Sequence, residues 1–204
     1  MTAAANPSRL RIAALISGGG RTVLNLLDAI EAGTLPVDIG VVISSSPKAA
    51  GVARLRERGL TVHCPPRDGH DAISAILRDS RIDLVCLAGY LRLFRVDPAF
   101  VGRVINIHPA LLPDFGGRGM YGNHVHAAVL AEGRSETGCT VHVVDDRYDH
   151  GPSLLQRRCP VRPDDDVATL AARVFAEEAI AYPEAIGQFA RGAWPLPVAV
   201  ASRG

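Results

Sequence analysis

Residues 11–22 read Arg11-Ile12-Ala13-Ala14-Leu15-Ile16-Ser17-Gly18-Gly19-Gly20-Arg21-Thr22, an almost unbroken apolar run that ends in three glycines. Residues 11–16 predict a buried strand. Residues 22–32 place apolar side chains at helical spacing, and Gly33 is a typical helix stop. A strand, a glycine turn and a helix in succession form the first part of a parallel strand-helix-strand unit.

The same alternation continues along the chain. Strands are predicted at residues 37–43, 60–63, 83–87 and 103–107, and helices at 49–58 and 71–78. These strands are apolar on both faces, which indicates a parallel sheet covered on two sides. The sequence therefore predicts a doubly wound α/β domain, whose ligands sit beyond the carboxyl ends of the strands.

The pattern changes after residue 110. A short helix is expected at 124–132, antiparallel strands at 137–144 and 153–161, and a long amphipathic helix at 167–189, interrupted near Pro183. The prediction is a mostly parallel, doubly wound sheet to which the C-terminal part adds antiparallel strands.

Length and composition suggest one domain over residues 10–191, with a disordered leader at 1–9 and a tail at 192–204. The 204 residues are 48% hydrophobic and carry a net charge of +1, so no footprint for nucleic acid stands out. No apolar run reaches membrane-spanning length, and the leader does not resemble a signal peptide. Four cysteines without Cys-x-x-Cys spacing indicate reduced thiols, so we expect a cytoplasmic protein.

Asn106 and His108 lie two residues apart in Val104-Ile105-Asn106-Ile107-His108-Pro109, where an apolar strand meets a proline. Side chains two apart on a strand share a face, so an amide and an imidazole project together. This pair suits chemistry on a carbonyl group, with a donor and a titratable ring aimed at one oxygen. The alternative is a polar strand end that only closes a turn.

The glycine turn at residues 17–22 favours a bound anion. Glycines allow close approach of the backbone, and the following helix offers free N–H groups. A dinucleotide fingerprint requires Gly or Ala at position 23, where this chain has Val23. We therefore expect a phosphate or phosphosugar site rather than an NAD site, with an unoccupied glycine turn as the alternative.

Acidic and histidine residues supply two further hypotheses. Asp149 lies in an acidic turn between two predicted strands, where it could approach His108 and hold it protonated; otherwise it is a solvated turn residue. His124, His126 and His142, with Asp149, could bind zinc. Their spacing is not that of metal ligands on a helix, so we expect no metal, and His142 could simply line the pocket.

Three motifs together make a family recognisable: residues 106–113, residues 87–92 (Leu-Ala-Gly-Tyr-Leu-Arg), and Asp149-His150-Gly151-Pro152. Over residues 10 to about 190 the chain resembles the glycinamide ribonucleotide formyltransferases, folate-dependent enzymes of purine biosynthesis. The phosphate loop and the short length favour this branch of the folate formyltransferases.

The resemblance implies transfer of a formyl group from 10-formyltetrahydrofolate to the amine of 5-phosphoribosylglycinamide. It implies two small-molecule substrates, no metal, no membrane or nucleic-acid partner, and a monomer or homodimer. The N-terminal half would bind the phosphosugar, and the C-terminal half would bind folate and carry catalysis.

The same resemblance assigns the site residues. Asn106, His108 and Asp149 match the catalytic trio. Ribonucleotide binding falls to Gly18, Gly19, Gly20, Arg21, Thr22 and Glu178, and folate binding to Arg67, Leu91, Arg92, Leu93, Phe94, Asn106, Asp145, Asp146, Arg147 and Tyr148.

The chain departs from the family pattern in three places. Arg21-Thr22 stands where the family often has Ser-Asn, the segment 116–123 is longer than in many members, and His150 replaces a frequent small residue. Two alternative functions stay open: a 10-formyltetrahydrofolate hydrolase, which uses water as the acceptor, and a phosphosugar-binding regulatory module.

Overall fold

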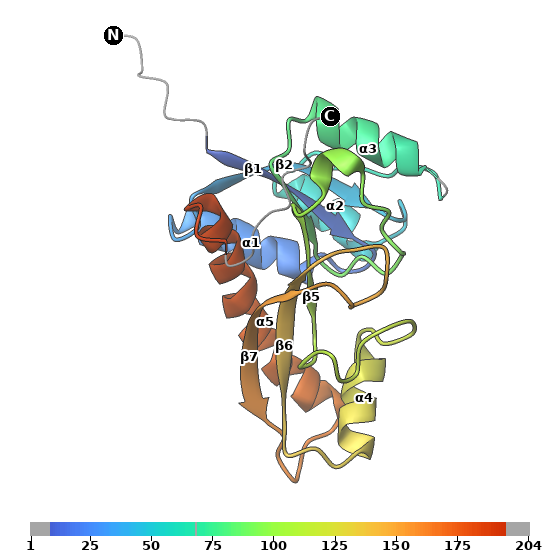
Figure 1. Ribbon diagram of the computed structural model, residues 1–204, viewed down its shortest axis with the longest axis vertical. Helices are drawn as coiled ribbons and strands as arrows, with labels where there is room; N and C mark the ends of the chain where they lie inside the picture. Colours follow the sequence, from blue (N-terminus) through green and yellow to red (C-terminus); the bar gives the residue numbers. More distant parts are fainter. Residues whose placement is uncertain (1–8, 68, 195–204) are drawn as a thin grey trace.

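The computed structural model describes residues 9–67 and 69–194. The strands form one sheet in the order β3-β2-β1-β4-β5-β6-β7 (Figure 1). In chain order the elements are β1 (Leu10–Ile16), α1 (Arg21–Glu31), β2 (Val37–Ser44), α2 (Ala50–Glu57), β3 (Val62–His63), α3 (His70–Asp79), β4 (Leu84–Leu87), a 3-10 turn (Pro98–Phe100), β5 (Val104–His108), α4 (Asn123–Ala131), β6 (Glu136–Val143), β7 (Ser153–Pro160) and α5 (Val167–Ala190).

The predicted fold class is confirmed. Strands β1 to β5 pair in parallel, while β6 and β7 are antiparallel additions beyond β5. Alternate residues of β1 enter two separate cores: Ile12 and Ile16 pack with α1, α2 and α5, whereas Ala13 and Leu15 pack with α3. Burial on both faces is why this strand is apolar throughout.

Pro183 does not interrupt the last helix, contrary to the expectation from the sequence. Helix α5 is continuous from Val167 to Ala190. A proline within a helix leaves the carbonyl four residues earlier without its N–H partner. Here that carbonyl belongs to Ala179, and it accepts a hydrogen bond of 2.9 Å from the side-chain amide of Asn25 on α1. The helix therefore continues because a neighbouring helix supplies the missing donor.

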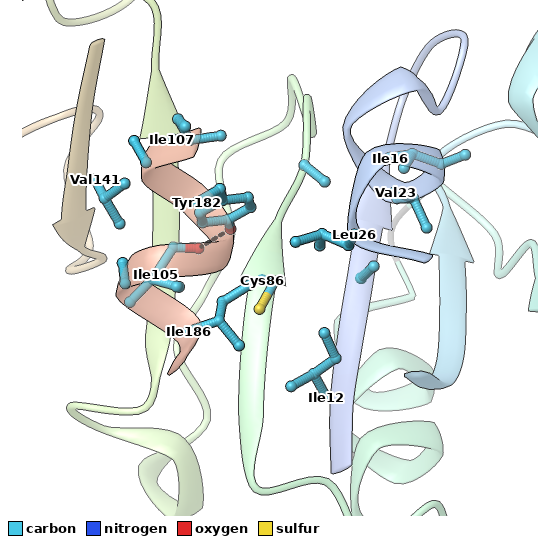
Figure 2. Packing of buried hydrophobic residues seen from close by; sticks show 14 of the residues in the cluster. Ile12, Ile16, Val23, Leu26, Cys86, Ile105, Ile107, Val141, Tyr182 and Ile186 are labelled. Atoms are coloured by element: carbon cyan, nitrogen blue, oxygen red, sulfur yellow. Dashed lines mark hydrogen bonds between the residues drawn. The ribbon is translucent and has the colours of Figure 1, made fainter. Parts of the chain in front are cut away.

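Tyr182 ties α5 to the centre of the sheet (Figure 2). Its side chain is fully buried, and its hydroxyl lies 3.0 Å from the carbonyl oxygen of Leu87 and 3.2 Å from that of Ile105. These carbonyls lie on β4 and β5, and Ile105 directly precedes Asn106. The hydroxyl therefore anchors the two strands whose ends lead to the site described below.

Two expectations fall largely outside the described part of the chain. Of the leader at 1–9 only Arg9 is described, and of the tail at 192–204 only residues 192–194. Within residues 9–67 and 69–194, no helix has the length and apolar character needed to cross a membrane.

The Tyr182 anchor gives a stability prediction. Tyr182→Phe leaves two buried carbonyls without this donor, so the free energy of unfolding should fall by about 1–2 kcal/mol. Urea unfolding followed by circular dichroism measures this difference. The matched control is Tyr121→Phe, since Tyr121 is 45% exposed and should show no loss. Equal stability of the Tyr182→Phe variant and the unaltered protein would contradict the anchoring role.

Candidate active site

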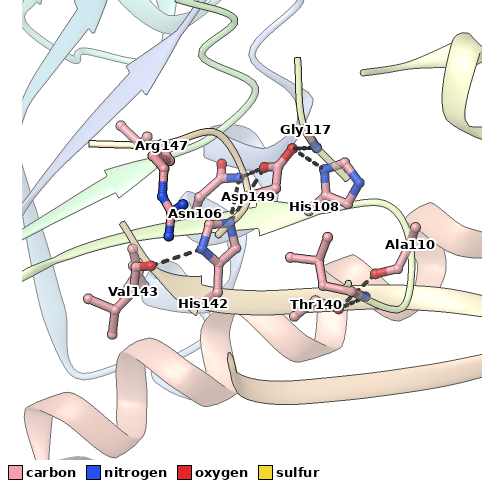
Figure 3. A network of polar contacts seen from close by, with 12 residues as sticks. Asn106, His108, Ala110, Gly117, Thr140, His142, Val143, Arg147 and Asp149 are labelled. Atoms are coloured by element: carbon pink, nitrogen blue, oxygen red, sulfur yellow. Dashed lines mark hydrogen bonds and ion pairs between the residues drawn. The ribbon is translucent and has the colours of Figure 1, made fainter. Parts of the chain in front are cut away.

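Asn106, His108 and Asp149 come together at the carboxyl end of β5 (Figure 3). The Asn106 amide nitrogen lies 3.3 Å from Oδ1 of Asp149, and Nδ1 of His108 lies 3.4 Å from Oδ2 of the same carboxylate. Asp149 belongs to the connection between β6 and β7, which the antiparallel pairing of β6 with β5 brings over the strand end. The structure thus brings Asp149 beside the Asn106 and His108 pair.

The Asp149 carboxylate is ionised although it is largely buried. Its side chain is 10% exposed, and its backbone adopts a left-handed conformation with φ 51°. Burial alone would raise its pKa, but contacts with His142, His108 and the backbone N–H of Gly117, at 3.0 Å, outweigh it and hold the pKa below the usual value. The carboxylate is thus a negative charge held in place by donors on several sides.

His108 differs from expectation in its protonation. Its side chain is 4% exposed, and this burial lowers the pKa of the ring; Asp149 and the Phe115 carbonyl raise it only in part, so the pKa lies below the ordinary value. We expected Asp149 to hold the ring protonated, but desolvation of the cation is the larger effect. Nε2 lies 2.8 Å from the Phe115 carbonyl oxygen, so the neutral ring carries its proton on Nε2.

His142 fixes the orientation of Asn106. Its Nδ1 lies 2.9 Å from the Val143 carbonyl and donates to it, which leaves Nε2 as an acceptor 3.1 Å from the Asn106 amide nitrogen. The two N–H groups of Asn106 are therefore directed at His142 and Asp149. Rotating the amide would place its oxygen against the carboxylate, so this orientation is the favourable one.

The segment after β5 is held by side chains of β6 and β7. The buried Thr140 hydroxyl donates to the Ala110 carbonyl at 2.7 Å and accepts from the Leu112 N–H at 3.0 Å. Gln156 donates to the Leu112 carbonyl at 2.9 Å. These bonds restrain the segment that delivers the Phe115 carbonyl to His108.

The glycine turn forms the other end of the site. Gly20 has φ 71°, and a Cβ there would lie 3.1 Å from the Leu55 side chain, so the position favours glycine. Gly20 precedes α1 without a side-chain cap, which leaves the first N–H groups of the helix free for an anion. The loop rests on Gly51 of α2, whose N–H donates to the Gly18 carbonyl at 3.1 Å.

Arg21 and Glu178 face each other across this end of the site. The Arg21 guanidinium lies 3.4 Å from the centre of the Phe175 ring on α5. Burial raises the pKa of Glu178 to about 7, and the charge of Arg21 opposes that rise. Glu178 thus exchanges its proton near neutral pH, unlike an ordinary surface carboxylate.

One cavity of about 710 Å³ joins the two ends. It is bordered by Arg21, Thr22 and Glu178 at one end and by Asn106, His108 and Asp149 at the other. Gly18, Gly19 and Gly20 do not border it; they only shape the turn before α1. A volume of this size is typical of small-molecule sites.

The predicted folate residues divide between two cavities. Arg67, Leu91 and Tyr148 border the large cavity. A second cavity of about 50 Å³ is lined by the predicted folate residues Arg92, Leu93, Phe94, Asn106, Asp145, Arg147 and Tyr148, together with Leu87, Tyr90, His142, Val144 and Asp149. Asp146 borders neither cavity.

Sequence reasoning missed several groups of the site. The Phe115 carbonyl and the Gly117 N–H are backbone groups whose positions no side-chain pattern reveals. The sequence indicates His142 only as a metal ligand or a pocket-lining residue, and its bond to Asn106 depends on the register of β5 and β6. Within residues 9–67 and 69–194, no group of three or more His, Cys, Asp or Glu side chains is arranged to hold a metal ion.

Comparisons with known proteins agree with this geometry. A model of the formyl transferase family matches residues 10–186. The chain is 39% identical over 187 residues to a chloroplastic phosphoribosylglycinamide formyltransferase of Vigna unguiculata, covering 87% of this chain and 60% of the relative. It is 34% identical to the phosphoribosylglycinamide formyltransferase of Escherichia coli, covering 90% of this chain and 88% of the relative.

Comparison with solved structures also shows similarity to an enzyme of this kind. The glycinamide ribonucleotide transformylase 1 of Symbiobacterium toebii superposes with a TM-score of 0.83 at 38% identity, covering 92% of this chain and 90% of that chain. The chain spans less than two thirds of the plant relatives' length, 60% for Vigna unguiculata and 65% for Arabidopsis thaliana. It belongs to the formyl transferase family, where it is similar to the phosphoribosylglycinamide formyltransferases.

Proposed function

We propose that this protein transfers the formyl group of 10-formyltetrahydrofolate to the amine of 5-phosphoribosylglycinamide. The observation that carries the proposal is the single cavity that joins an anion-binding helix end to the Asn106, His108 and Asp149 cluster. The similarity to phosphoribosylglycinamide formyltransferases supports it. The phosphate lies at the start of α1, and the amine reaches the Asp149 end.

In the proposed reaction the amine attacks the formyl carbon, which gives a tetrahedral carbon with a negatively charged oxygen. One N–H of Asn106 turns to this oxygen. The Nε2–H of His108 also donates to it, in place of the Phe115 carbonyl that it now contacts. A neutral imidazole is a competent donor, as the lowered pKa of His108 requires.

The Asp149 carboxylate accepts the proton that the amine loses and passes it to the folate nitrogen. Attack makes the amine nitrogen positive, and the ionised carboxylate accepts its proton directly or through a water molecule. The same proton then passes to the folate nitrogen as the bond between that nitrogen and the formyl carbon breaks. The proton balance closes without a covalent intermediate on the enzyme.

The small cavity beside Asn106 is the proposed entry for the folate ring. Leu87, Leu93, Phe94 and Val144 provide its apolar walls. Tyr148, which borders both this cavity and the large one, is 39% exposed.

The activity itself is tested by incubating the protein with 10-formyltetrahydrofolate in the presence and absence of the ribonucleotide. Conversion to tetrahydrofolate, followed by absorbance, should require the ribonucleotide and give the formylated amine. Release of formate without the ribonucleotide would instead favour the hydrolase alternative. Binding of the ribonucleotide without any turnover would favour the regulatory module.

Asp149→Asn tests the pairing with His108. Removal of the negative charge takes away an interaction that raises the pKa of His108, so the ring should titrate at still lower pH. The kcat should fall by about 10²–10⁴-fold, as for loss of a general base. His108→Ala should be similarly inactive, and the double variant little worse than either single variant. NMR titration of His108 and a double-mutant cycle in kcat measure these effects.

The direction in which activity changes with pH shows whether His108 acts as a neutral ring or as a charged ring. With a lowered pKa, His108 is neutral above that pKa, and activity should be lost as the pH falls and the ring becomes charged. An enzyme that needs the charged ring would instead lose activity as the pH rises through the same pKa. A ring in the unaltered protein that titrates above its ordinary value of about 6.5 would contradict the neutral-donor model.

Gly51→Ala tests the phosphate end without touching a substrate. A Cβ at Gly51 would lie 2.8 Å from the Gly18 carbonyl oxygen and 2.9 Å from Gly20 N, so the glycine turn must move. The KM for the ribonucleotide should rise several-fold while the KM for the folate stays unchanged. Gly187→Ala is the matched helix control, because its Cβ would crowd the flexible end of Arg191, at 3.2 Å, and would meet Leu35 in ordinary contact at 3.9 Å. An unchanged ribonucleotide KM would place the phosphate elsewhere.

A further inference from the structure

His126 is a buried histidine that the proposed mechanism does not use. It lies on α4, is 4% exposed and borders the large cavity. Its Nδ1 is buried and has no hydrogen-bond partner among the described residues. Unpartnered buried polar atoms are rare and costly, so this ring is retained at a cost to stability.

The buried Nδ1 determines which tautomer the ring adopts. Burial lowers the pKa of His126, and the nearby charge of Arg21 lowers it further, so the ring is neutral at pH 7. A neutral imidazole carries one proton. On Nδ1 that proton would find no acceptor among the described residues. His126 borders the large cavity, so a proton on Nε2 is the one that water or a ligand in the cavity can accept. His126 therefore presents one N–H donor to the cavity.

The position of this donor indicates what it binds. His126 borders the same cavity as Arg21, at the phosphate end, and His108, at the reacting end. A ribonucleotide that reaches from one to the other places its uncharged middle part, the ribose and the amide carbonyl, alongside His126. Glu178 of α5 borders the same cavity.

We propose that His126 is a specificity-determining residue for the acceptor substrate. The Nε2–H of His126 donates a hydrogen bond to an uncharged oxygen of the substrate, located between the phosphate and the amine of that substrate. The role rests on the proposed function, because it concerns the same substrate. This role explains why a histidine occupies the position although its unpartnered Nδ1 lowers the stability of the protein. Residues that reduce stability are commonly retained because they serve binding.

Three substitutions at one position test the role. Leucine fills a similar volume without polar atoms, glutamine places an amide nitrogen near the position of Nε2, and asparagine places one near Nδ1. The dissociation constant of phosphoribosylglycinamide, measured by calorimetry, should rise about tenfold in His126→Leu, as for loss of one hydrogen bond. His126→Gln should recover most of the affinity, and His126→Asn should not.

Stability and a neighbouring residue provide the controls. His126→Leu should be at least as stable to urea as the unaltered protein, because it removes an unpartnered buried nitrogen. His124 lies on the same helix but is exposed, so His124→Leu should leave the affinity unchanged. Folate affinity should be unaffected in all of these variants.

Ribose 5-phosphate, which lacks the glycinamide, identifies the accepting oxygen. Weaker binding of this probe to His126→Leu assigns the hydrogen bond to the ribose, and unchanged binding assigns it to the amide carbonyl. Unchanged affinity of His126→Leu for the ribonucleotide, or recovery by asparagine rather than glutamine, would overturn the role of His126. Failure of the unaltered protein to bind the ribonucleotide would instead contradict the proposed function itself.

Discussion

The buried carboxylate of Asp149 is the constraint on which the site depends. A negative charge at this depth is unfavourable unless donors surround it. Here the N–H of Gly117 and the amide of Asn106 donate to it from two different segments. Each segment must be in place for the charge to persist, so the carboxylate links the site to the fold.

That requirement explains the change in sheet topology after β5. The antiparallel pairing places Asn106 opposite His142 and His108 opposite Thr140. His142 orients the amide of Asn106, and Thr140 restrains the segment whose Phe115 carbonyl contacts the His108 ring. The parallel half supplies a helix end suited to an anion, so the two halves of the sheet contribute different chemistry to one cavity.

Much of this arrangement can be predicted from local patterns. The apolar strands, the glycine stops and the Asn106–His108 spacing depend on periods of two and 3.6 residues, which the sequence displays directly. Backbone partners such as the Phe115 carbonyl cannot be read this way, because they depend on how a loop folds back. The continuity of α5 through Pro183 likewise depends on Asn25, which is distant in sequence. The protonation of His108 follows from its degree of burial, which no motif encodes.

The decisive measurement is a structure of the protein bound to 5-phosphoribosylglycinamide and a folate without the formyl group. We expect the phosphate on the N–H groups at the start of α1, the amine within hydrogen-bond distance of the Asp149 carboxylate, and the folate nitrogen beside Asn106. A ribonucleotide bound in the reverse direction, or one that leaves Asp149 without a substrate contact, would contradict the proposed mechanism.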